Sequence, residues 1–285
     1  MEINNNIHIF AQKKNWMFVG EGLDNLVYTN SKKELVFRVP KKEDTQEAIK
    51  KEAVVLPRLA GNVKNIHIPI PTIFDSEEIW YASYPFVKGV CLDTVKDVAR
   101  RQNAFEQLGV ALAELHTQDV SLFSEITRIV PEKKYHIVQE KAVQLPKNVL
   151  NDEQRRYIQE LFAAFFSFIK PQTIPLALVH GDISEEHIYY NEAQHVVSII
   201  DWSDITMTDP AYEFYHLLRD VSAREQEFFI QAYNTTDPLF WKRAEYYMYL
   251  DTIEVLCLFV EKHNTEQIKQ FIACVDQDSK NWKAM

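Results

Sequence analysis

The hydrophobic pattern of residues 1–87 is typical of a group of strands with one helix. Short apolar stretches lie on either side of a turn at 21–25, as the two strands of a hairpin would. One longer segment instead carries apolar side chains at helical spacing. We expect its helix to end or kink at Pro57, because proline has no backbone N–H to donate. The predicted strands are 15–20, 26–29, 34–39 and 79–87, and the predicted helix is 45–59.

After residue 88 the pattern becomes mostly helical. Two short strand-like stretches interrupt the helical spacing, and each ends on an acidic motif. The sequence therefore predicts an α+β protein in which a small β-rich part, 1–87, precedes a large helical part, 88–285. The predicted helices are 102–116, 152–169 and most of the chain from 212 onward, and the interrupting strands are 176–179 and 196–200.

Composition excludes several classes of protein. The chain has 285 residues, of which 46% are hydrophobic and 25% charged, as in an ordinary globular protein. Its net charge of −10 disfavours a nucleic-acid binder, which would need a basic face. The longest apolar run, 161–169, is too short to span a membrane, which takes about 20 residues. We expect no membrane segment and no secretory signal, because no basic stretch leads into an apolar one at the start.

Cysteine usage and charge placement add two expectations. Three cysteines that lie far apart form neither a metal spacing nor a disulfide framework, which favours the reducing cytoplasm. Residues 1–100 hold 14 basic and 13 acidic side chains, so the whole acidic excess follows residue 100. This excess either serves solubility or offers a surface to a cationic small molecule.

Glycine is scarce, with six residues in the chain. We expect such a chain to use glycine where the backbone has no alternative. Gly20 and Gly22 lie two apart in the predicted hairpin turn, and Gly181 lies within the strongest motif of the sequence.

Two acidic motifs carry the strongest chemical signal. His180-Gly181-Asp182 follows one buried strand, and Asp201 follows the next strand 19 residues after Asp182. Kinases place two carboxylates on neighbouring loops in this way: one accepts the proton of the substrate hydroxyl and the other binds Mg²⁺. A single aspartate at a strand end is more often a turn or cap residue. The pair, together with an upstream glycine turn and a basic residue on a strand, favours the kinase interpretation.

The upstream residues supply the phosphate-binding part of that interpretation. Backbone amides of the glycine turn at 20–25 are suited to cover phosphates, although many hairpins contain two glycines. Arg38, near the end of the next strand, would neutralise phosphate oxygens. Glu52 on the following helix would orient Arg38, with Glu47 as a rival partner and a solvated helix face as the structural alternative.

The sequence resembles the aminoglycoside phosphotransferase family, specifically the branch of aminoglycoside 2″-phosphotransferases and macrolide 2′-phosphotransferases. The resemblance covers about residues 15–255. It implies a bilobal protein-kinase-like fold with a nucleotide-binding lobe at 1–87 and a helical lobe at 88–285, which holds the catalytic loop and the substrate cleft. The carrying motifs are Gly20 to Asn25, Val36 to Pro40, Leu108 to His116, His180-Gly181-Asp182 with His187, and Ile200-Asp201-Trp202 with Asp209-Pro210.

The resemblance also implies roles for individual residues. His187 stands where most kinases have asparagine, and Mg²⁺ prefers oxygen ligands, so a hydrogen-bonded core histidine is the alternative for it. Tyr84 would lie behind the purine and favour guanine; if it is an ordinary packing residue, Phe86 is the alternative wall. The implied assignments are Asp182 as the catalytic residue, Asp201 and His187 as metal ligands, Gly20, Gly22, Asn25, Arg38, Glu52, Tyr84 and Phe86 for the nucleotide, His180 and Asp209 as supports of the catalytic loop, and Glu213, Tyr246 and Glu254 for the substrate.

The expected activity is transfer of the γ-phosphoryl group of GTP or ATP, with Mg²⁺, to a hydroxyl of an aminoglycoside antibiotic. Three alternatives remain: a macrolide 2′-phosphotransferase, a housekeeping kinase of an amino alcohol or sugar, and a catalytically silent kinase-like binding protein. We expect a cytoplasmic monomer whose partners are a nucleotide and a small-molecule acceptor.

Overall fold

The computed structural model describes residues 2–22, 24–170 and 173–284. Leu23 of the predicted glycine turn lies outside the described residues. The chain packs into two compact units, and each is built from several segments of the sequence. The first unit combines residues 1–126, 180–205 and 224–234, and the second combines 127–179, 206–223 and 235–285.

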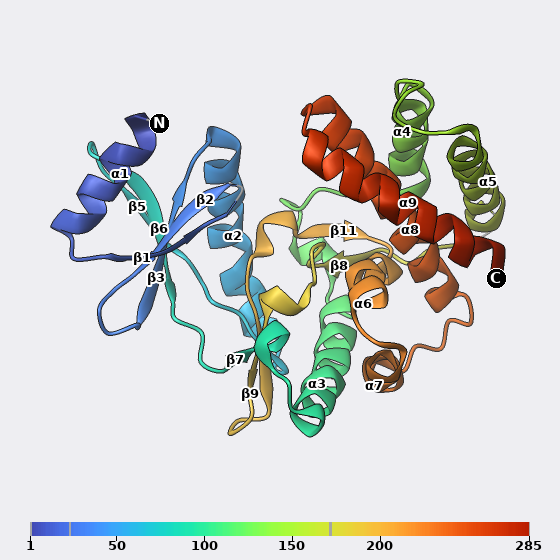
Figure 1. Cartoon of the computed structure of the whole chain (residues 1–285). Helices are drawn as coiled ribbons and strands as arrows, with labels where there is room; N and C mark the ends of the chain where they lie inside the picture. Colours follow the sequence, from blue (N-terminus) through green and yellow to red (C-terminus); the bar gives the residue numbers. More distant parts are fainter. Residues whose placement is uncertain (1, 23, 171–172, 285) are drawn as a thin grey trace. The chain divides into compact units, whose positions relative to one another are not determined.

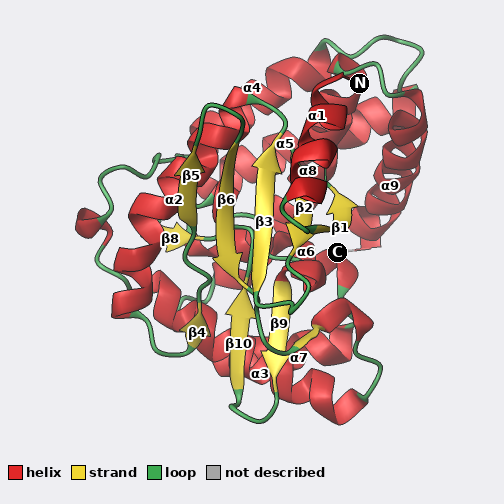
Figure 2. Cartoon of the chain, turned by 90° about the vertical axis from the view of Figure 1, so that its left-hand side faces the viewer, coloured by secondary structure: helices red, strands yellow, loops and turns green. Residues whose placement is uncertain are grey.

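The first unit begins with helix α1 (Glu2–Lys13) and an antiparallel sheet. Within the described residues, five strands follow one another across this sheet in the order β1-β2-β3-β6-β5 (Figure 2). The predicted hairpin is present as β1 paired with β2, and its register shifts between Phe18 and Gly20. The strands are β1 (Met17–Glu21), β2 (Asn25–Thr29), β3 (Leu35–Pro40), β5 (Thr72–Asp75) and β6 (Trp80–Pro85).

Helix α2 (Glu43–Asn62) runs through Pro57, so the expectation that it ends there is wrong, and the alternative of a kink at this residue stays a prediction. An interior proline costs a helix about 3 kcal/mol. The apolar face of α2 outweighs this cost, because Ile49, Val55, Leu56 and Leu59 are all fully buried. Each such side chain contributes about 1.5–3 kcal/mol when it leaves water.

A second sheet of the first unit has an acidic motif on either side of its hairpin in the sequence: Asp182 comes before strand β9 (Ile188–Asn191) and Asp201 comes after strand β10 (Val196–Ile199). Among the described strands its order is β4-β10-β9-β7, and β4 pairs with β10 in parallel across a long sequence separation. Helix α3 (Val98–His116) contacts β10. Helix α7 (Ala223–Tyr233) lies close to α3 at Gly109, because a Cβ at Gly109 would be 2.6 Å from the carbonyl oxygen of Phe229 in α7. The strands are β4 (Ile66–His67), β7 (Val90–Cys91), β9 (Ile188–Asn191) and β10 (Val196–Ile199), with 3₁₀ turns at Leu92–Thr94, Val120–Leu122, Glu185–His187 and Trp202–Asp204.

The second unit is mainly helical, as the sequence pattern predicts (Figure 1). Its described strands are β8 (Ala177–Val179) and β11 (Thr206–Thr208), which pair with each other. Helix α8 is its central element, since it contacts α4, α5, α6 and α9. The helices are α4 (Pro131–Val143), α5 (Asp152–Ile169), α6 (Tyr215–Asp220), α8 (Phe240–Glu261) and α9 (Thr265–Ala284), with a 3₁₀ turn at Pro210–Phe214.

The packing units do not follow a single cut at residue 88. The predicted lobes were defined by secondary structure, whereas segments 180–205 and 224–234 pack with the first unit. The boundary at 87/88 therefore stays a prediction.

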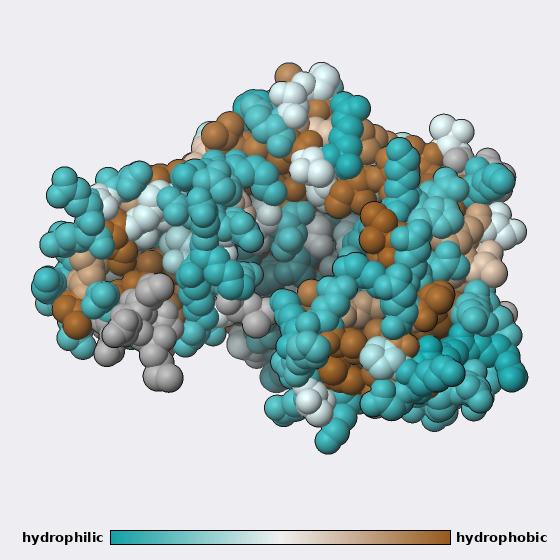
Figure 3. All heavy atoms as spheres, turned by 90° about the horizontal axis from the view of Figure 1, so that it is seen from above, coloured by the Kyte–Doolittle hydropathy of each residue, from teal (hydrophilic) through white to brown (hydrophobic). Residues whose placement is uncertain are grey.

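Hydrophilic side chains cover much of the face drawn in Figure 3, with apolar areas between them.

Candidate active site

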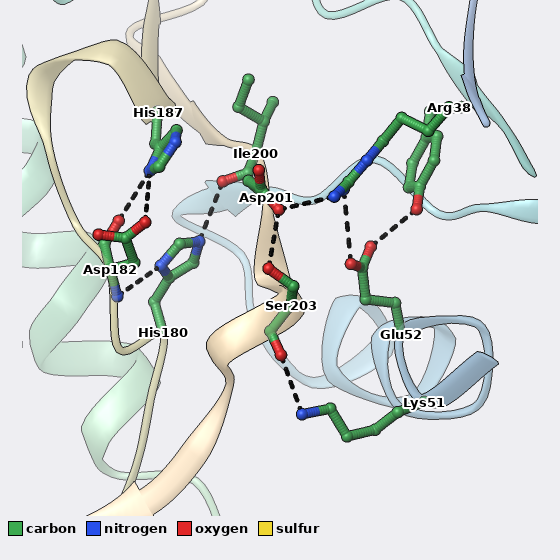
Figure 4. Close-up of polar contacts among 10 residues, drawn as sticks. Arg38, Lys51, Glu52, His180, Asp182, His187, Ile200, Asp201 and Ser203 are labelled. Carbon is green, nitrogen blue, oxygen red and sulfur yellow. Dashed lines mark hydrogen bonds and ion pairs between the residues drawn. The ribbon is translucent and has the colours of Figure 1, made fainter. Parts of the chain in front are cut away.

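Asp201 lies just beyond strand β10, after Ile200, in a left-handed backbone conformation with φ 62° and ψ 66°. Few residues other than glycine adopt this conformation, and aspartate is among those that tolerate it best. The carboxylate accepts hydrogen bonds from Arg38 Nη2 at 2.9 Å and from the Ser203 hydroxyl at 3.0 Å (Figure 4). It retains 37% of its exposure, so it is held in place and still accessible.

The predicted contact between Arg38 and Glu52 is present. Arg38 on β3 extends Nη1 to Glu52 Oε1 at 3.5 Å, while its Nη2 reaches Asp201. Glu52 is on the buried face of α2, where its side chain is 1% exposed. The rival residue Glu47 instead pairs with Lys50 at 2.7 Å. One guanidinium thus bridges two carboxylates from distant parts of the sequence (Figure 4).

The charges of this group influence one another strongly. Burial raises the pKa of Glu52 to about 7, although Arg38 favours its charged form. Burial also opposes the charge of Arg38, but the two carboxylates outweigh it and raise the pKa of the guanidinium. At Asp201, burial is outweighed by Arg38 and then His187, so the pKa of this carboxyl is lowered. Asp201 is therefore an anion at neutral pH, as a metal ligand must be.

The loop that carries Asp182 is fixed by its neighbours. Gly181 has φ 92°, and a Cβ at this position would lie 2.6 Å from the carbonyl oxygen of Asp204. His180 has no exposed surface. Its Nδ1 accepts a hydrogen bond from the backbone N–H of Asp182 at 3.3 Å. The ring proton is therefore on Nε2, which donates to the carbonyl oxygen of Ile200 at 3.0 Å. This one imidazole connects the backbone of both acidic motifs, and its role as a support of the catalytic loop stays a prediction.

His187 faces the same loop. Its Nδ1 donates to the backbone carbonyl of Asp182 at 2.8 Å and lies 3.6 Å from Asp182 Oδ2. Because a carbonyl only accepts, Nδ1 carries a proton and the neutral ring keeps its lone pair on Nε2. His187 is thus hydrogen-bonded, as in its structural alternative, and a metal contact stays a prediction.

Two adjoining cavities in the first unit connect most of the predicted residues. The smaller, about 190 Å³, is lined by Arg38, Tyr84, Phe86 and Asp201 together with apolar side chains. The larger, about 610 Å³, is lined by Gly22, Asn25, Arg38, Asp182, His187 and Asp201. Arg38 and Asp201 line both. An apolar slot beside a polar chamber suits a purine and its phosphates, respectively.

The glycine turn differs from expectation. A Cβ at Gly20 would meet nothing within 4 Å, and at Gly22 only the carbonyl oxygen of Asn25 at 3.9 Å. The expectation that the backbone has no alternative to glycine at these two positions is therefore wrong, whereas it holds at Gly181. Lys41 fixes the turn instead, because its Nζ binds Gly22 O and the Glu21 carboxylate, each at 2.6 Å.

Sequence reasoning missed Lys51. Its Nζ donates to the carbonyl oxygens of Ser203 at 3.0 Å and Ile205 at 3.4 Å, which ties α2 to the turn after Asp201 (Figure 4). The only signal in the sequence was its position next to Glu52, because hydrogen bonds to backbone carbonyl oxygens do not produce a side-chain pattern. Ser203, which contacts Asp201, was likewise missed.

The remaining predicted residues are in the second unit. Asp209 is 1% exposed and accepts hydrogen bonds from Arg243 Nε at 2.6 Å and from the Tyr247 hydroxyl at 2.7 Å. It also accepts from the backbone N–H of Ala211 at 3.0 Å, so its recorded partners are in helix α8 and in the turn that follows Asp209, and its support of the catalytic loop stays a prediction.

The three predicted substrate residues differ in accessibility. Glu213 is fully buried, and Tyr246 is 7% exposed and packs against Phe165, Phe168 and Trp282. Glu254 is 34% exposed and pairs with Lys134 at 2.8 Å. Their burial and pairing give no direct support to substrate contact, which stays a prediction.

Three features of the described residues bear on other classes of site. All three cysteines are free. Within the described ranges, no cluster of three or more histidine, cysteine or acidic side chains could hold a metal ion by itself. Of the helices that the structure describes, none has the length and apolar character to cross a bilayer.

The fold and the paired carboxylates define a kinase-like phosphotransferase. Residues 15–247 match the model of the phosphotransferase enzyme family that contains the aminoglycoside phosphotransferases, and the chain belongs to this family. The resemblance stated from the sequence and the predicted kinase-like fold are confirmed.

Solved structures similar to this chain share its fold at low identity. The GDP complex of wild-type aminoglycoside 2′-phosphotransferase-IIIa is 21% identical over 98% of both chains, with a TM-score of 0.86. The gentamicin complex of APH(2″)-IIa is 17% identical over 96% of this chain and 94% of the other, with a TM-score of 0.72. Macrolide 2′-phosphotransferase type I is 17% identical over 95% of each chain, with a TM-score of 0.69.

Proposed function

We propose that the enzyme transfers the γ-phosphoryl group of GTP or ATP to a hydroxyl of an aminoglycoside antibiotic. The observation that carries this proposal is the shared lining of one cavity by Asp182, Asp201 and Arg38. These are the groups that phosphoryl transfer requires: a carboxylate for the acceptor, a carboxylate for a metal ion and a fixed cation for the phosphates.

Asp182 is the catalytic residue in this proposal. Its carboxylate is 35% exposed, so an acceptor hydroxyl can reach it from the larger cavity. The hydroxyl donates a hydrogen bond to the carboxylate, which orients the attacking oxygen and takes the proton. As the new P–O bond forms, the bond between the γ-phosphorus and the β–γ bridging oxygen breaks, and the nucleoside diphosphate leaves. His180 and His187 hold the Asp182 backbone in place through its N–H and carbonyl, so little reorganisation is needed when the acceptor binds.

The residues present fit a magnesium ion bound together with a nucleotide. Mg²⁺ in such sites takes one or two carboxylates and completes its shell with water and phosphate oxygens. Asp201 supplies an ionised, accessible carboxylate in the larger cavity, and His187 Nε2 is the further donor. When bound, the ion would supply positive charge next to the phosphates. Arg38 releases part of its contact with Asp201 to bind phosphate oxygens, which it grips in a planar, bidentate manner.

The smaller cavity is the proposed purine site. Tyr84 is 6% exposed and lines this cavity with Phe86, so its ring narrows the space behind the base. We expect guanine to be accepted at least as well as adenine, because guanine bonds the connecting backbone from a shifted position. Discrimination by one such side chain amounts to ~1–3 kcal/mol.

The acidic excess after residue 100 favours a polycationic acceptor. A macrolide is the second candidate, since one of the similar structures is a macrolide 2′-phosphotransferase. Three free cysteines suit the reducing cytoplasm, where we place the enzyme as a monomer.

The test measures phosphate transfer from GTP and ATP, with Mg²⁺, to kanamycin-type, erythromycin-type, amino-alcohol and sugar acceptors. We expect transfer to the kanamycin type, and Asp182→Asn should lower kcat at least 100-fold with nucleotide binding retained. Asp75→Asn on the exposed strand β5 is the matched control and should leave kcat unchanged. Transfer only to a macrolide or a common metabolite would replace the acceptor assignment, and absence of any transfer would favour a silent binding protein.

A further inference from the structure

The hydroxyl of Tyr84 makes a contact that a purine wall does not need. Tyr84 is on strand β6, and its hydroxyl donates to Glu52 Oε2 at 2.9 Å. The other carboxylate oxygen, Oε1, receives Arg38 Nη1 at 3.5 Å. Each oxygen of Glu52 therefore has its own partner, and the shorter of the two bonds comes from Tyr84.

The burial of Glu52 gives the Tyr84 hydrogen bond its importance. Its side chain is 1% exposed, so water cannot replace a lost partner. A buried carboxylate oxygen left without a donor carries the full cost of desolvation. The tyrosine hydroxyl thus fixes the position of the carboxylate that anchors Arg38.

Arg38 is shared between two carboxylates, so the position of Glu52 also affects how Arg38 contacts Asp201. Its Nη2 is 2.9 Å from Asp201 Oδ1, closer than Nη1 is to Glu52. If Glu52 loosens, the guanidinium can move fully onto Asp201. It would then cover the carboxylate that is proposed to bind the metal and would no longer be positioned for phosphate.

We propose that Tyr84 is a positioning residue for the phosphate-binding pair, acting through its hydroxyl on Glu52 and thereby on Arg38. This inference rests on the proposed function, because it takes the two cavities as the nucleotide site. Tyr84 then has two separable roles: its ring shapes the purine slot, and its hydroxyl sets the partition of Arg38 between Glu52 and Asp201. The base and phosphate ends of the site are coupled through one side chain.

The two roles predict different effects for two variants. Tyr84→Phe keeps the ring and removes the hydroxyl, so the KM for both nucleotides should rise roughly tenfold, or about 1.4 kcal/mol. The ATP:GTP ratio of kcat/KM should stay within about twofold of wild type. Tyr84→Ala also removes the ring, and should shift that ratio toward ATP in addition.

Tyr81→Phe is the matched control. It makes the same chemical change on the same strand, but Tyr81 stacks on Phe74 with ring centroids 4.8 Å apart. Its KM for nucleotide should match wild type. A merely structural role of the Tyr84 hydroxyl would reduce the amount of folded enzyme, and so apparent kcat, without moving KM.

A double-mutant cycle identifies the route of the effect. In a Glu52→Met background the hydroxyl has no carboxylate to hold, so Tyr84→Phe should change the nucleotide KM less than about twofold. GDP affinity measured by titration gives the same comparison without an acceptor, so failure of the proposed transfer and failure of this inference can be told apart. An unchanged nucleotide KM and GDP affinity in Tyr84→Phe would overturn the inference, and so would an equal change in the Glu52→Met background or a shifted ATP:GTP ratio in Tyr84→Phe.

Discussion

Gly181 is the position at which an added methyl group should be most informative. Its φ of 92° is a conformation that side-chain-bearing residues rarely adopt, and a Cβ would lie 2.6 Å from the backbone oxygen of Asp204. Strained backbone of this kind costs of the order of 1–3 kcal/mol. The contact adds to this cost because its partner is backbone and cannot swing away. For Gly181→Ala we expect a loss of about 2–4 kcal/mol.

The effect should be measurable as both stability and activity. At roughly 2–4 °C per kcal/mol for a large single chain, the thermal midpoint should fall by about 4–16 °C. Asp204 ends the short 3₁₀ turn that begins next to Asp201, so its displacement should also lower kcat at a temperature where the variant remains folded. Gly20→Ala is the matched control, since its Cβ would meet nothing within 4 Å. It should change stability by less than about 0.5 kcal/mol. If both alanine variants melt within a degree of each other, the backbone argument is refuted.

Three other perturbations probe the same site. Asparagine tolerates the left-handed backbone at position 201 but has no charge, so in Asp201→Asn the nucleotide affinity should no longer depend on Mg²⁺. If a nucleotide titration with and without the ion shows an unchanged dependence, Asp201 is not the metal ligand. Lys51→Met should release the turn after Asp201 and raise the Mg²⁺ concentration needed for half-maximal transfer severalfold, whereas Lys50→Met, next to it and paired with Glu47, should not. Burial raises the pKa of Glu52 from 4.5 to about 7, so its contribution to the free energy of unfolding is fully present below pH 4.5 and is lost as pH rises through 7. Glu52→Gln should therefore flatten the dependence of the free energy of unfolding on pH across this window. If the variant keeps the wild-type slope, the assignment is contradicted.

The elements that could be predicted are those whose signal is local. Helix α5 spans Asp152–Ile169, as its apolar spacing predicts, and Asn151 with Gln154 forms a capping box at its start. The Arg38–Glu52 contact was also predictable, because a strand and the next helix bring these residues together. Helix α1 was missed although Ile7, Phe10 and Ala11 are buried at helical spacing.

The missed contacts depend on partners far away in sequence or on backbone atoms. Strand β4 is two residues long and exists because it pairs with β10, about 130 residues later. No local pattern encodes such a pairing. Lys51 binds carbonyl oxygens, and the hydroxyl of Tyr84 binds a carboxylate 32 residues away. A tyrosine in an aromatic-rich strand is therefore predicted as a packing or wall residue, and its polar function stays hidden.

The two acidic motifs share a physical feature that explains their arrangement. Asp182 follows a glycine at φ 92°, and Asp201 itself has φ 62°, so both carboxylates project from backbone that a regular strand would not adopt. Such conformations persist only where surrounding contacts over-determine them. Those contacts are present: His180 links Asp182 N to Ile200 O, and Lys51 holds the carbonyl of Ser203. Buried polar groups thus hold the carboxylates in place before any ligand arrives, which is the preorganisation that electrostatic catalysis requires.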